Sequence, residues 1–382
     1  MNLKRIIDTL RTYDFRSLNF RLIIYTIALS VLGIMVIGSA TDDPSYVKKQ
    51  ILGLVIGVVV MFVFALVKYE MIARYYWLLY IVNILILLMV TFFGVERSGA
   101  KRWIEIFNIQ FQPSELSKLL LMIFISVLLA RNVQSINSIK FILLTIGLFA
   151  VPLVLVLTQP DLSTSLVIIS VFCAIMFVSP ISGSLLKRIA LVVGIGLAVL
   201  LTLIILLPAD KNIIPKYQYN RLVGFYDPDN QIAADIRYQQ ENSVTAIAGG
   251  GVSGKGLNNS DITSVKNAEF ISEPQTDFIF TIIGEELGFL GSVGTLILIG
   301  LIIWECIRIG MRAREKIGQS IAIGYATMLA VQSFINIGVT TMLLPNTGLT
   351  LPFVSAGLSS LITSFLGIGI ILNIGLRKKI SF

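Results

Sequence analysis

Six charged side chains stand inside or at the edge of long apolar runs of this sequence: Glu115, Lys118, Asp161, Asp277, Glu285 and Glu286. A charge at the centre of a membrane span is unfavourable by at least about 2.5–3.5 kcal/mol, so these exceptions are the first candidates for chemistry. The sequence contains no histidine. Proton transfer must therefore fall to carboxylates, lysine, tyrosine or cysteine.

Asp277 is the strongest candidate for a general base. It follows Glu273-Pro274-Gln275-Thr276 and opens the apolar run that begins at Phe278. An aspartate at a helix start is often only a cap, and that interpretation stands beside the catalytic one. A partly desolvated carboxylate at this point would have a pKa above the roughly 3.9 of free aspartate and could act as a base near neutral pH.

Glu115 and Lys118 are three residues apart, just after Pro113, as in the first turn of a helix. One interpretation is a self-neutralising pair that keeps the helix end hydrated. The other is that the pair lines a polar cavity and touches a substrate.

Glu285 and Glu286 belong to Gly284-Glu285-Glu286-Leu287-Gly288. At about 100° per residue, Gly284, Gly288 and Gly291 would share the face of Asp277, and this small-residue spacing predicts close helix packing. We therefore expect the two glutamates to be structural, bonded to neighbouring helices. A two-carboxylate hydrolase is disfavoured.

Cations before the fourth apolar run, in Gly99-Ala100-Lys101-Arg102-Trp103, admit two interpretations, as do Arg221 and Arg237. They are common at membrane edges, or they are placed to bind an anionic lipid head group. The glycine-rich run over residues 249–256 lacks the spacing of a nucleotide-binding phosphate loop. It is better interpreted as a turning segment, with a backbone cradle for a pyrophosphate as the alternative.

The elements that must position these residues follow from composition. Hydrophobic residues make up 55% of the 382, and charged residues 14%, against about 45–50% and 25% in soluble proteins. We predict an all-α polytopic membrane protein with ten spans near residues 22–40, 50–67, 75–94, 113–130, 141–158, 163–181, 189–208, 277–304, 317–343 and 349–376.

The distribution of charge predicts the orientation of these spans. The segments 1–21, 68–74, 131–140, 182–188, 305–316 and 377–382 hold 18 of the 30 lysines and arginines but 5 of the 22 acids. Both termini are therefore expected in the cytoplasm, and the basic surplus gives no reason to expect nucleic acid. We expect one membrane domain over residues 1–382, with an interfacial segment at 1–21 and a large extracytoplasmic loop at 209–276.

Short motifs recur in order along the whole chain. They are Gly99-Ala100-Lys101-Arg102-Trp103, Phe111-Gln112-Pro113-Ser114-Glu115 with Lys118, Gln159-Pro160-Asp161, Ser243 with Ala246-Ile247 and Gly249-Gly250, Gly254-Lys255-Gly256, Thr276-Asp277-Phe278-Ile279-Phe280, Gly284-Glu285-Glu286-Leu287-Gly288, Leu344-Pro345-Asn346-Thr347-Gly348 and Leu351-Pro352-Phe353-Val354-Ser355. With the ten-span layout, these motifs resemble the SEDS family of bacterial cell-wall proteins (RodA, FtsW and SpoVE), and RodA most of all.

The resemblance implies a peptidoglycan glycosyltransferase of the bacterial cytoplasmic membrane. Such an enzyme polymerises lipid II, a disaccharide-peptide on undecaprenyl pyrophosphate, on the outer face of the membrane, here for cell elongation and shape. The resemblance makes Asp277 the essential aspartate, and we expect it to act as the base of an inverting transfer. Substrate-binding residues are expected to be Lys101, Arg102, Trp103, Glu115, Lys118, Arg221 and Ser355.

The resemblance also implies partners: the growing glycan strand and a class B penicillin-binding protein, a transpeptidase. No cofactor is expected with certainty, and a divalent cation is possible. The chain departs from the family at Gln275, where histidine is common, at Asn242 and Ser163, and within residues 355–360, which lack the usual tyrosine and second glycine. None of these departures falls on Asp277.

Two other classes of function stay open at this point. A lipid II flippase would use the same cavity without forming a bond, and it would tolerate Asp277→Asn. A non-catalytic scaffold would ignore changes at Asp277, whereas Gly288→Leu on a packed helix face would disrupt its assembly. The polar residues within the apolar runs and the long outer loop favour the enzyme.

Overall fold

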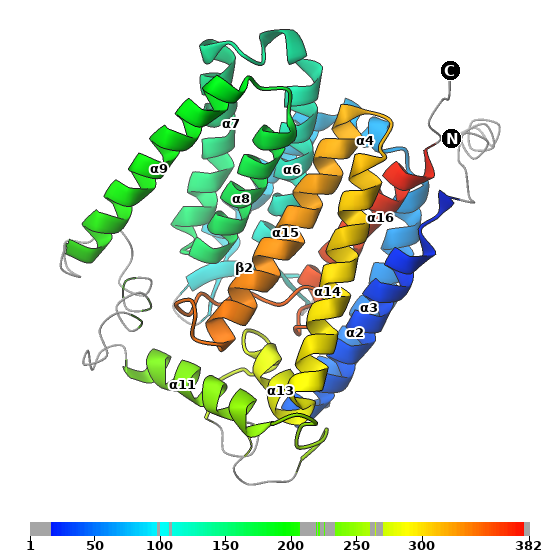
Figure 1. The fold of residues 1–382 in the computed structure, drawn as a ribbon, viewed down its shortest axis with the longest axis vertical. Helices are drawn as coiled ribbons and strands as arrows, with labels where there is room; N and C mark the ends of the chain where they lie inside the picture. Colours follow the sequence, from blue (N-terminus) through cyan, green and yellow to red (C-terminus); the bar gives the residue numbers. More distant parts are fainter. Residues whose placement is uncertain are drawn as a thin grey trace.

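The computed structural model describes residues 17–97, 100–106, 109–206, 219, 221, 225, 234–259, 264 and 270–377. Within this part, helices stand side by side in a bundle (Figure 1). Eight of them are long and apolar enough to cross a membrane: α2 (Phe20–Ala40), α3 (Pro44–Leu66), α5 (Tyr76–Phe93), α6 (Pro113–Arg131), α7 (Ile139–Thr158), α14 (Gly288–Met311), α15 (Lys316–Thr340) and α16 (Leu358–Leu376).

Two further helices occupy the positions of the sixth and seventh predicted spans. The apolar helix α8 (Leu162–Val178) has 17 residues, and α9 (Gly183–Leu206) has 24. The prediction of a bundle of helices long enough to span a membrane is confirmed. The count of ten spans stays a prediction, because eight helices of the described part meet the length and hydropathy criteria together.

Short polar side chains set where several helices begin. Asn19 accepts a hydrogen bond from the backbone N–H of Leu22 at the start of α2, and Asp43 accepts one from Ser45 at the start of α3. Asp161 caps α8 in the same way, with the N–H of Thr164 as donor. These caps satisfy N–H groups that have no partner within the helix.

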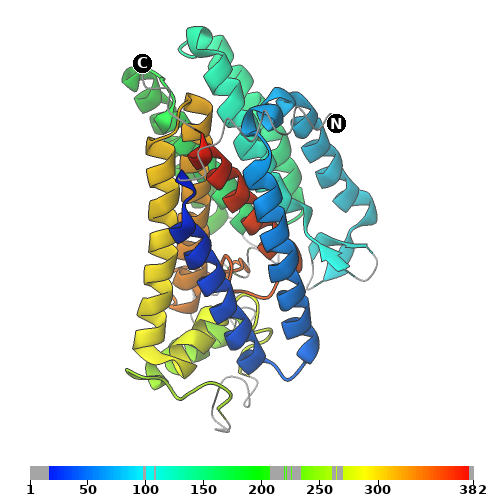
Figure 2. The same cartoon turned by 90° about the vertical axis from the view of Figure 1, so that its right-hand side faces the viewer.

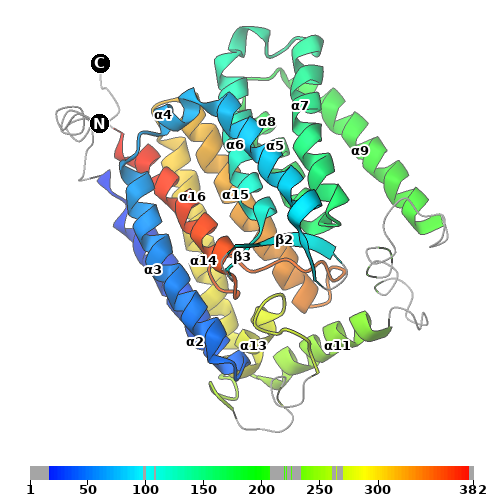
Figure 3. The same ribbon diagram turned by 180° about the vertical axis from the view of Figure 1, so that it is seen from behind.

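The helices differ in how deeply they lie in the bundle. Most side chains of α6, α15 and α16 are buried, whereas fewer than a third of those of α3, α5 and α7 are. In Figure 3 α16 and α6 lie between α3 on one side and α7 on the other. Helices inside the bundle are also those that carry buried polar residues, among them Glu115, Gln332 and Asn336, and such groups require hydrogen-bond partners.

A small sheet interrupts the expected all-α architecture. Strands β1 (Val95–Arg97), β2 (Ala100–Ile106) and β3 (Ile109–Phe111) form an antiparallel sheet in that order between α5 and α6. Trp103 pairs with Val95, and Ile104 pairs with Phe111. The segment is too short and too polar to be a span, and pairing in a sheet satisfies its backbone groups.

The predicted span 277–304 is wrong at its start, because it consists of two helices. α13 (Ile279–Glu286) ends at Leu287, and α14 begins at Gly288, whose φ is +65°. A Cβ on Gly288 would lie 2.3 Å from the backbone nitrogen of Gly254, so another segment occupies the space beside the break. The left-handed conformation of Gly288 ends α13 and changes the direction of the chain before α14.

Two other predicted boundaries also need correction. The last span begins at Leu358 rather than at residue 349, because residues 345–357 form an irregular segment in which Phe353 has φ of +66°. The predicted loop 209–276 contains a helix, α11 (Ala234–Gly249). Residues 1–16 of the predicted interfacial segment, and residues 207–218, 226–233 and 265–269 of the loop region, lie outside the described residues.

The two ends of the described chain meet at one end of the bundle. Ser17 Oγ donates to the backbone carbonyl of Gly375 at 3.2 Å. The start of α2 and the end of α16 lie together in both views (Figures 1 and 2), and α11 and α13 lie at the opposite end. This arrangement agrees with the prediction that both termini are on one side of the membrane.

Candidate active site

A cavity of about 620 Å³ lies between the start of α3, the small sheet, the segment before α13 and the irregular segment before α16. Its charged lining residues in the described part are Asp43, Lys49, Arg102, Glu115, Asp161, Arg221, Glu273 and Asp277. Trp103 and Phe278 add aromatic surface. A charged cavity in an otherwise apolar bundle is the natural place for a ligand and for chemistry.

Asp277 and Arg221 converge beside Gly348 in this cavity. Gly348 has φ of +72°, and a Cβ placed on it would lie 3.2 Å from Oδ2 of Asp277 and 3.0 Å from Nη1 of Arg221. The carboxylate and the guanidinium therefore reach the same point of the irregular segment from different parts of the chain. Glycine leaves that point open, and its positive φ suits glycine better than other residues.

The environment of Asp277 changes its acidity. The pKa of Asp277 is raised from 3.8 to about 6, and burial is the main cause. The guanidinium groups of Arg221 and Arg102 oppose this rise, whereas the carboxylate of Glu273 contributes to it. The residue lies before α13 and α14, outside the membrane-spanning helices. Such a carboxylate is ionised at neutral pH and is more basic than free aspartate, as a general base requires.

Asp277 does not cap the helix that follows it. The N-cap position of α13 is Phe278, and no side chain makes a capping hydrogen bond there. The carboxylate instead lines the cavity. The interpretation of Asp277 as a helix cap is therefore not supported by the structure.

The backbone around Asp277 is held from two directions. Asn336 on α15 donates to the carbonyl of Asp277 at 2.8 Å. Ser355 Oγ donates to the carbonyl of Thr276 at 2.6 Å, and the backbone N–H of Ala356 donates to the carbonyl of Gln275 at 2.9 Å. The proposed base thus stands on a segment fixed by α15 and by the irregular segment before α16.

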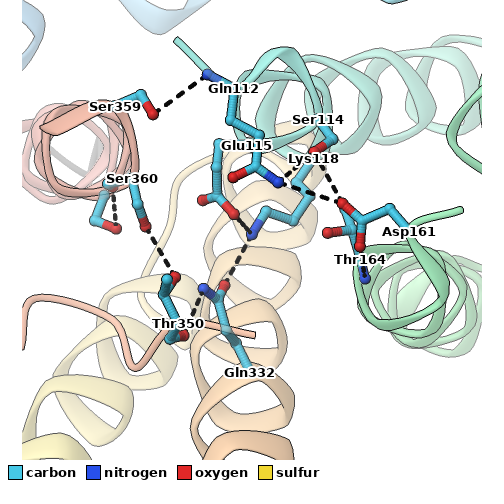
Figure 4. Close-up of polar contacts among 11 residues, drawn as sticks. Gln112, Ser114, Glu115, Lys118, Asp161, Thr164, Gln332, Thr350, Ser359 and Ser360 are labelled. Carbon is cyan, nitrogen blue, oxygen red and sulfur yellow. Dashed lines mark hydrogen bonds and ion pairs between the residues drawn. The ribbon is translucent and has the colours of Figure 1, made fainter. Parts of the chain in front are cut away.

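The opposite wall of the cavity is organised around Asp161. Its Oδ2 accepts from Ser114 Oγ at 3.2 Å and from Gln112 Nε2 at 3.3 Å, while Oδ1 accepts from the N–H of Thr164 at 3.1 Å (Figure 4). Arg102 on β2 donates to the backbone carbonyls of residues 159 and 160, directly before Asp161. The sheet, α6 and α8 are joined at this point.

Glu115 and Lys118 form a buried pair that extends behind the cavity. Lys118 Nζ lies 2.8 Å from Glu115 Oε1 and 3.0 Å from Gln332 Oε1 (Figure 4). Gln332 in turn donates to the carbonyl of Thr350 at 3.1 Å. Glu115 lines the cavity, and the network ties it through α15 to the irregular segment. Both side chains are buried, so the pair does not serve to hydrate the helix end. Glu115 is paired and also lines the cavity, and its contact with a substrate stays a prediction.

The structure places the predicted site residues in two groups. Five of them line the cavity: Arg102, Trp103, Glu115, Arg221 and Asp277. Three do not: Lys118 is buried behind Glu115, Ser355 is buried beneath Thr276, and Lys101 is exposed. Lys101 and Arg102 are neighbours on a strand, where successive side chains point to opposite faces. The substrate-binding roles of seven of these residues and the catalytic role of Asp277 stay predictions.

Sequence reasoning did not assign a role to several residues that shape the site. Gln332 and Asn336 stand four apart in a charge-free helix, and an amide in an apolar run was an available signal for both. Asp161 was recognised as exceptional but was not placed in the site. Lys49 and Gln239 also line the cavity, and nothing in their sequence context marks them.

The glycine-rich run surrounds the junction of α13 and α14 rather than forming a nucleotide site. Backbone N–H groups of Lys255 and Gly256 donate to the carbonyls of Glu285 and Glu286 at 3.0 and 2.9 Å. Lys255 Nζ also pairs with Glu285 at 2.8 Å, and Glu286 accepts from Ser39 on α2 at 2.6 Å. Glu286 thus bonds to a neighbouring helix, as expected, whereas Glu285 pairs with Lys255, a residue of the glycine-rich run that lies outside the helices.

Among the described residues, no three histidine, cysteine, aspartate or glutamate side chains converge as a metal-binding group. A divalent cation in the reaction stays a prediction.

Comparisons with known proteins agree with this geometry. Residues 17–380 match the family of FtsW, RodA and SpoVE, described as cell cycle proteins. The chain is 31% identical over 366 residues to stage V sporulation protein E of Bacillus subtilis. This match covers 92% of this chain and 95% of that protein. It is 32% identical over 371 residues to the peptidoglycan glycosyltransferase MrdB of Escherichia coli, which covers 96% of each.

Solved structures share the fold. A chain from a study of the structural coordination of polymerization and crosslinking by a peptidoglycan synthase complex gives a TM-score of 0.77 at 29% identity, covering 95% of this chain and 97% of that one. The rod shape determining protein RodA of Thermus thermophilus gives 0.66 at 26% identity, covering 95% and 96%. The protein therefore belongs to the FtsW, RodA and SpoVE family, the SEDS family of multi-pass proteins of the cytoplasmic membrane.

Proposed function

We propose that this protein is a peptidoglycan glycosyltransferase that polymerises lipid II into glycan strands on the outer face of the cytoplasmic membrane. The observation that carries the proposal is the Asp277 carboxylate, with a pKa of about 6, beside Arg221 in a charged cavity. The names of the curated relatives, which are peptidoglycan glycosyltransferases, support the same reaction.

In the proposed reaction, Asp277 accepts the proton of the sugar 4-hydroxyl of an acceptor lipid II. The oxygen forms a bond to the anomeric carbon of the growing chain, and the bond from that carbon to undecaprenyl pyrophosphate breaks. Attack from the face opposite the leaving group inverts the configuration. A general base of this kind contributes about 10²–10⁴-fold to the rate.

The leaving group is a pyrophosphate, so the protein must mainly position the two sugars and offset negative charge. Arg102 and Arg221 line the cavity and are the cations best placed for this role. Lys49, at the start of α3, lines the same cavity. Lys101 is exposed on the sheet and is a weaker candidate.

The lipid tail needs a route from the cavity into the membrane. Leu52 of α3 lines the cavity, and its side chain is also exposed on the outside of the bundle. Val55 and Val59 continue this exposed apolar face along α3. We place the undecaprenyl chain over this face, because burial of apolar surface favours the contact.

The partner we propose is a class B penicillin-binding protein, which would cross-link the glycan that this protein makes. One solved relative comes from a peptidoglycan synthase complex in which polymerization and crosslinking are coordinated. The Gly254-Lys255-Gly256 motif favours a role in elongation and cell shape.

The test is polymerisation of labelled lipid II by the purified protein, alone and with its transpeptidase partner. Wild type should make glycan chains, and Asp277→Asn should lower the rate by at least about 10²-fold. Glu241→Gln is the matched control, because Glu241 is exposed on α11 and does not line the cavity. Circular dichroism and size exclusion establish that each variant is folded.

Each outcome separates the classes of function. No polymer from folded wild type with the partner present would contradict the enzyme and favour a flippase or a scaffold. Polymer from wild type and Asp277→Asn at equal rates would retain the enzyme and remove Asp277 as its base.

A further inference from the structure

A second cavity lies at the other end of the bundle, where the ends of the described chain meet. Its volume is about 380 Å³, and it is lined by the first residues of α2, the last turns of α14 and Gly375. The predicted charge distribution places this end of the bundle in the cytoplasm. The proposed transfer reaction takes place at the opposite end and makes no use of this cavity.

The charges around the second cavity are unequal. Three arginines, Arg21, Arg308 and Arg312, line it together with one carboxylate, Glu305. Glu305 is buried and already engaged: Oε2 accepts from Asn19 Nδ2 at 2.6 Å, and Oε1 lies 3.5 Å from Nη1 of Arg308. Within the part of the chain that the structure describes, Arg21 and Arg312 form no ion pair. The cavity therefore has an excess of positive charge.

The surroundings of this cavity are those of a membrane interface. Phe20 lines the cavity and is 62% exposed, and Trp304 and Met311, next in sequence to the lining residues Glu305 and Arg312, are 62% and 65% exposed. Such exposure would be unfavourable in water but is suited to acyl chains. Tryptophan is enriched at the level of lipid head groups. Leu18 and Ile309 contribute apolar walls to the cavity itself.

We propose that this cavity binds the phosphate-bearing head group of an anionic phospholipid from the cytoplasmic leaflet. The guanidinium groups of Arg21 and Arg312 bind the phosphate oxygens, a geometry to which arginine is well matched. Glu305 and Asn19 hold Arg308 and the start of α2 in place around them. The positive end of the α2 dipole adds to the attraction, and basic pockets between helices on this side recognise such head groups.

The experiment is native mass spectrometry of the purified full-length protein titrated with phosphatidylglycerol or phosphatidylcholine. We expect wild type to retain phosphatidylglycerol in preference to phosphatidylcholine. Arg21→Gln and Arg312→Gln should each weaken phosphatidylglycerol binding about fivefold. Neither substitution should change phosphatidylcholine binding. Arg312→Lys, which keeps the charge, should retain most of the affinity.

Arg314→Gln is the matched control, because Arg314 is an exposed arginine two residues beyond Arg312 that does not line the cavity. Equal binding of the two lipids by wild type, or an equal loss in Arg314→Gln, would overturn the proposal.

A separate titration uses inorganic phosphate without lipid. If phosphate alone raises the melting temperature of wild type but not of Arg312→Gln, and displaces phosphatidylglycerol, the site binds free phosphate and the lipid assignment is wrong. If Arg21→Gln does not fold, the pair Arg312→Gln and Arg312→Lys decides the question.

Discussion

Asn336 holds Asp277 through the backbone. Its Nδ2 donates to the carbonyl of Asp277 at 2.8 Å and also to the carbonyl of Leu349 at 2.6 Å. One buried amide on α15 therefore ties the segment of the proposed base to the irregular segment that lies beside it. Since it acts on Asp277 only through the main chain, Asn336 is a positioning residue.

Replacing Asn336 by alanine should lower kcat more than it changes KM. The loss of both hydrogen bonds should also lower the free energy of unfolding by about 1–3 kcal/mol. A displacement of about 1 Å at a base can reduce the rate about 10²-fold. The measurements are lipid II polymerisation kinetics and thermal unfolding. Asn132→Ala is the control, because Asn132 Nδ2 also donates to a backbone carbonyl, that of Leu128 at 2.8 Å, away from the cavity. Similar kcat losses in both variants would contradict a positioning role.

The rate of polymerisation should depend on the ionisation of Asp277. Since the base must be deprotonated and its pKa is about 6, kcat/KM should fall about tenfold per pH unit below that value and level off above it. Arg221 lowers this pKa, so Arg221→Gln should move the acid limb to higher pH. Arg237→Gln, on the exposed side of α11, should leave the limb in place. An unchanged limb in Asp277→Asn would assign the titration to another group.

The Glu115–Lys118 pair should behave as a unit. Glu115→Gln or Lys118→Met alone leaves a buried charge without its partner, which should lower stability by about 3–5 kcal/mol. The double variant Glu115→Gln/Lys118→Met should be closer to wild type than the sum of the single variants, because no buried charge is left. Thermal unfolding of the four proteins tests this expectation. Additive losses would show that the two side chains do not act together.

Adding one methyl group at Gly348 should impair catalysis directly. The Cβ of Gly348→Ala would lie 3.0 Å from Arg221 Nη1 and 3.2 Å from Asp277 Oδ2, on a residue with φ of +72°. The backbone strain is about 1–2 kcal/mol, and the two side chains must move apart. We expect lower kcat in the lipid II assay. Gly294→Ala on α14, where a Cβ would meet nothing within 4 Å, should keep full activity. Wild-type kcat in Gly348→Ala would mean that the contact at Gly348 does not constrain the reaction.

Much of the fold was predictable because membrane helices obey local rules. Ten apolar runs predicted helices of spanning length, and eight helices of the described residues are long and apolar enough to cross a membrane. Local rules missed the three-stranded sheet, the break at Gly288, the irregular segment over residues 345–357 and the helix α11 within the predicted loop. Residues 349–357 are mostly apolar, so their composition resembles that of a helix. Their backbone groups are instead satisfied by contacts such as that between Ala356 and Gln275.

The same division applies to the site. Asp277 and Glu115 were identifiable from sequence because a charge in an apolar context needs a reason, and Arg102 was identifiable from the family resemblance. Lys101 and Arg102 have equivalent sequence contexts. They differ in the structure because successive side chains of strand β2 point to opposite faces of the sheet. Asn336 acts on a carbonyl 59 residues away in sequence, a relationship that no spacing rule contains.

The sequence by itself therefore determined the membrane class, the family resemblance and the charged residues that had to be explained. Tertiary structure alone decided which of those residues meet. Hydropathy and charge are properties of each residue and its near neighbours, so they can be identified along the chain. The convergence of Asp277 and Arg221 at Gly348 depends instead on how segments distant in sequence pack together. In a packed protein, buried backbone and side-chain groups find hydrogen-bond partners wherever these lie along the chain.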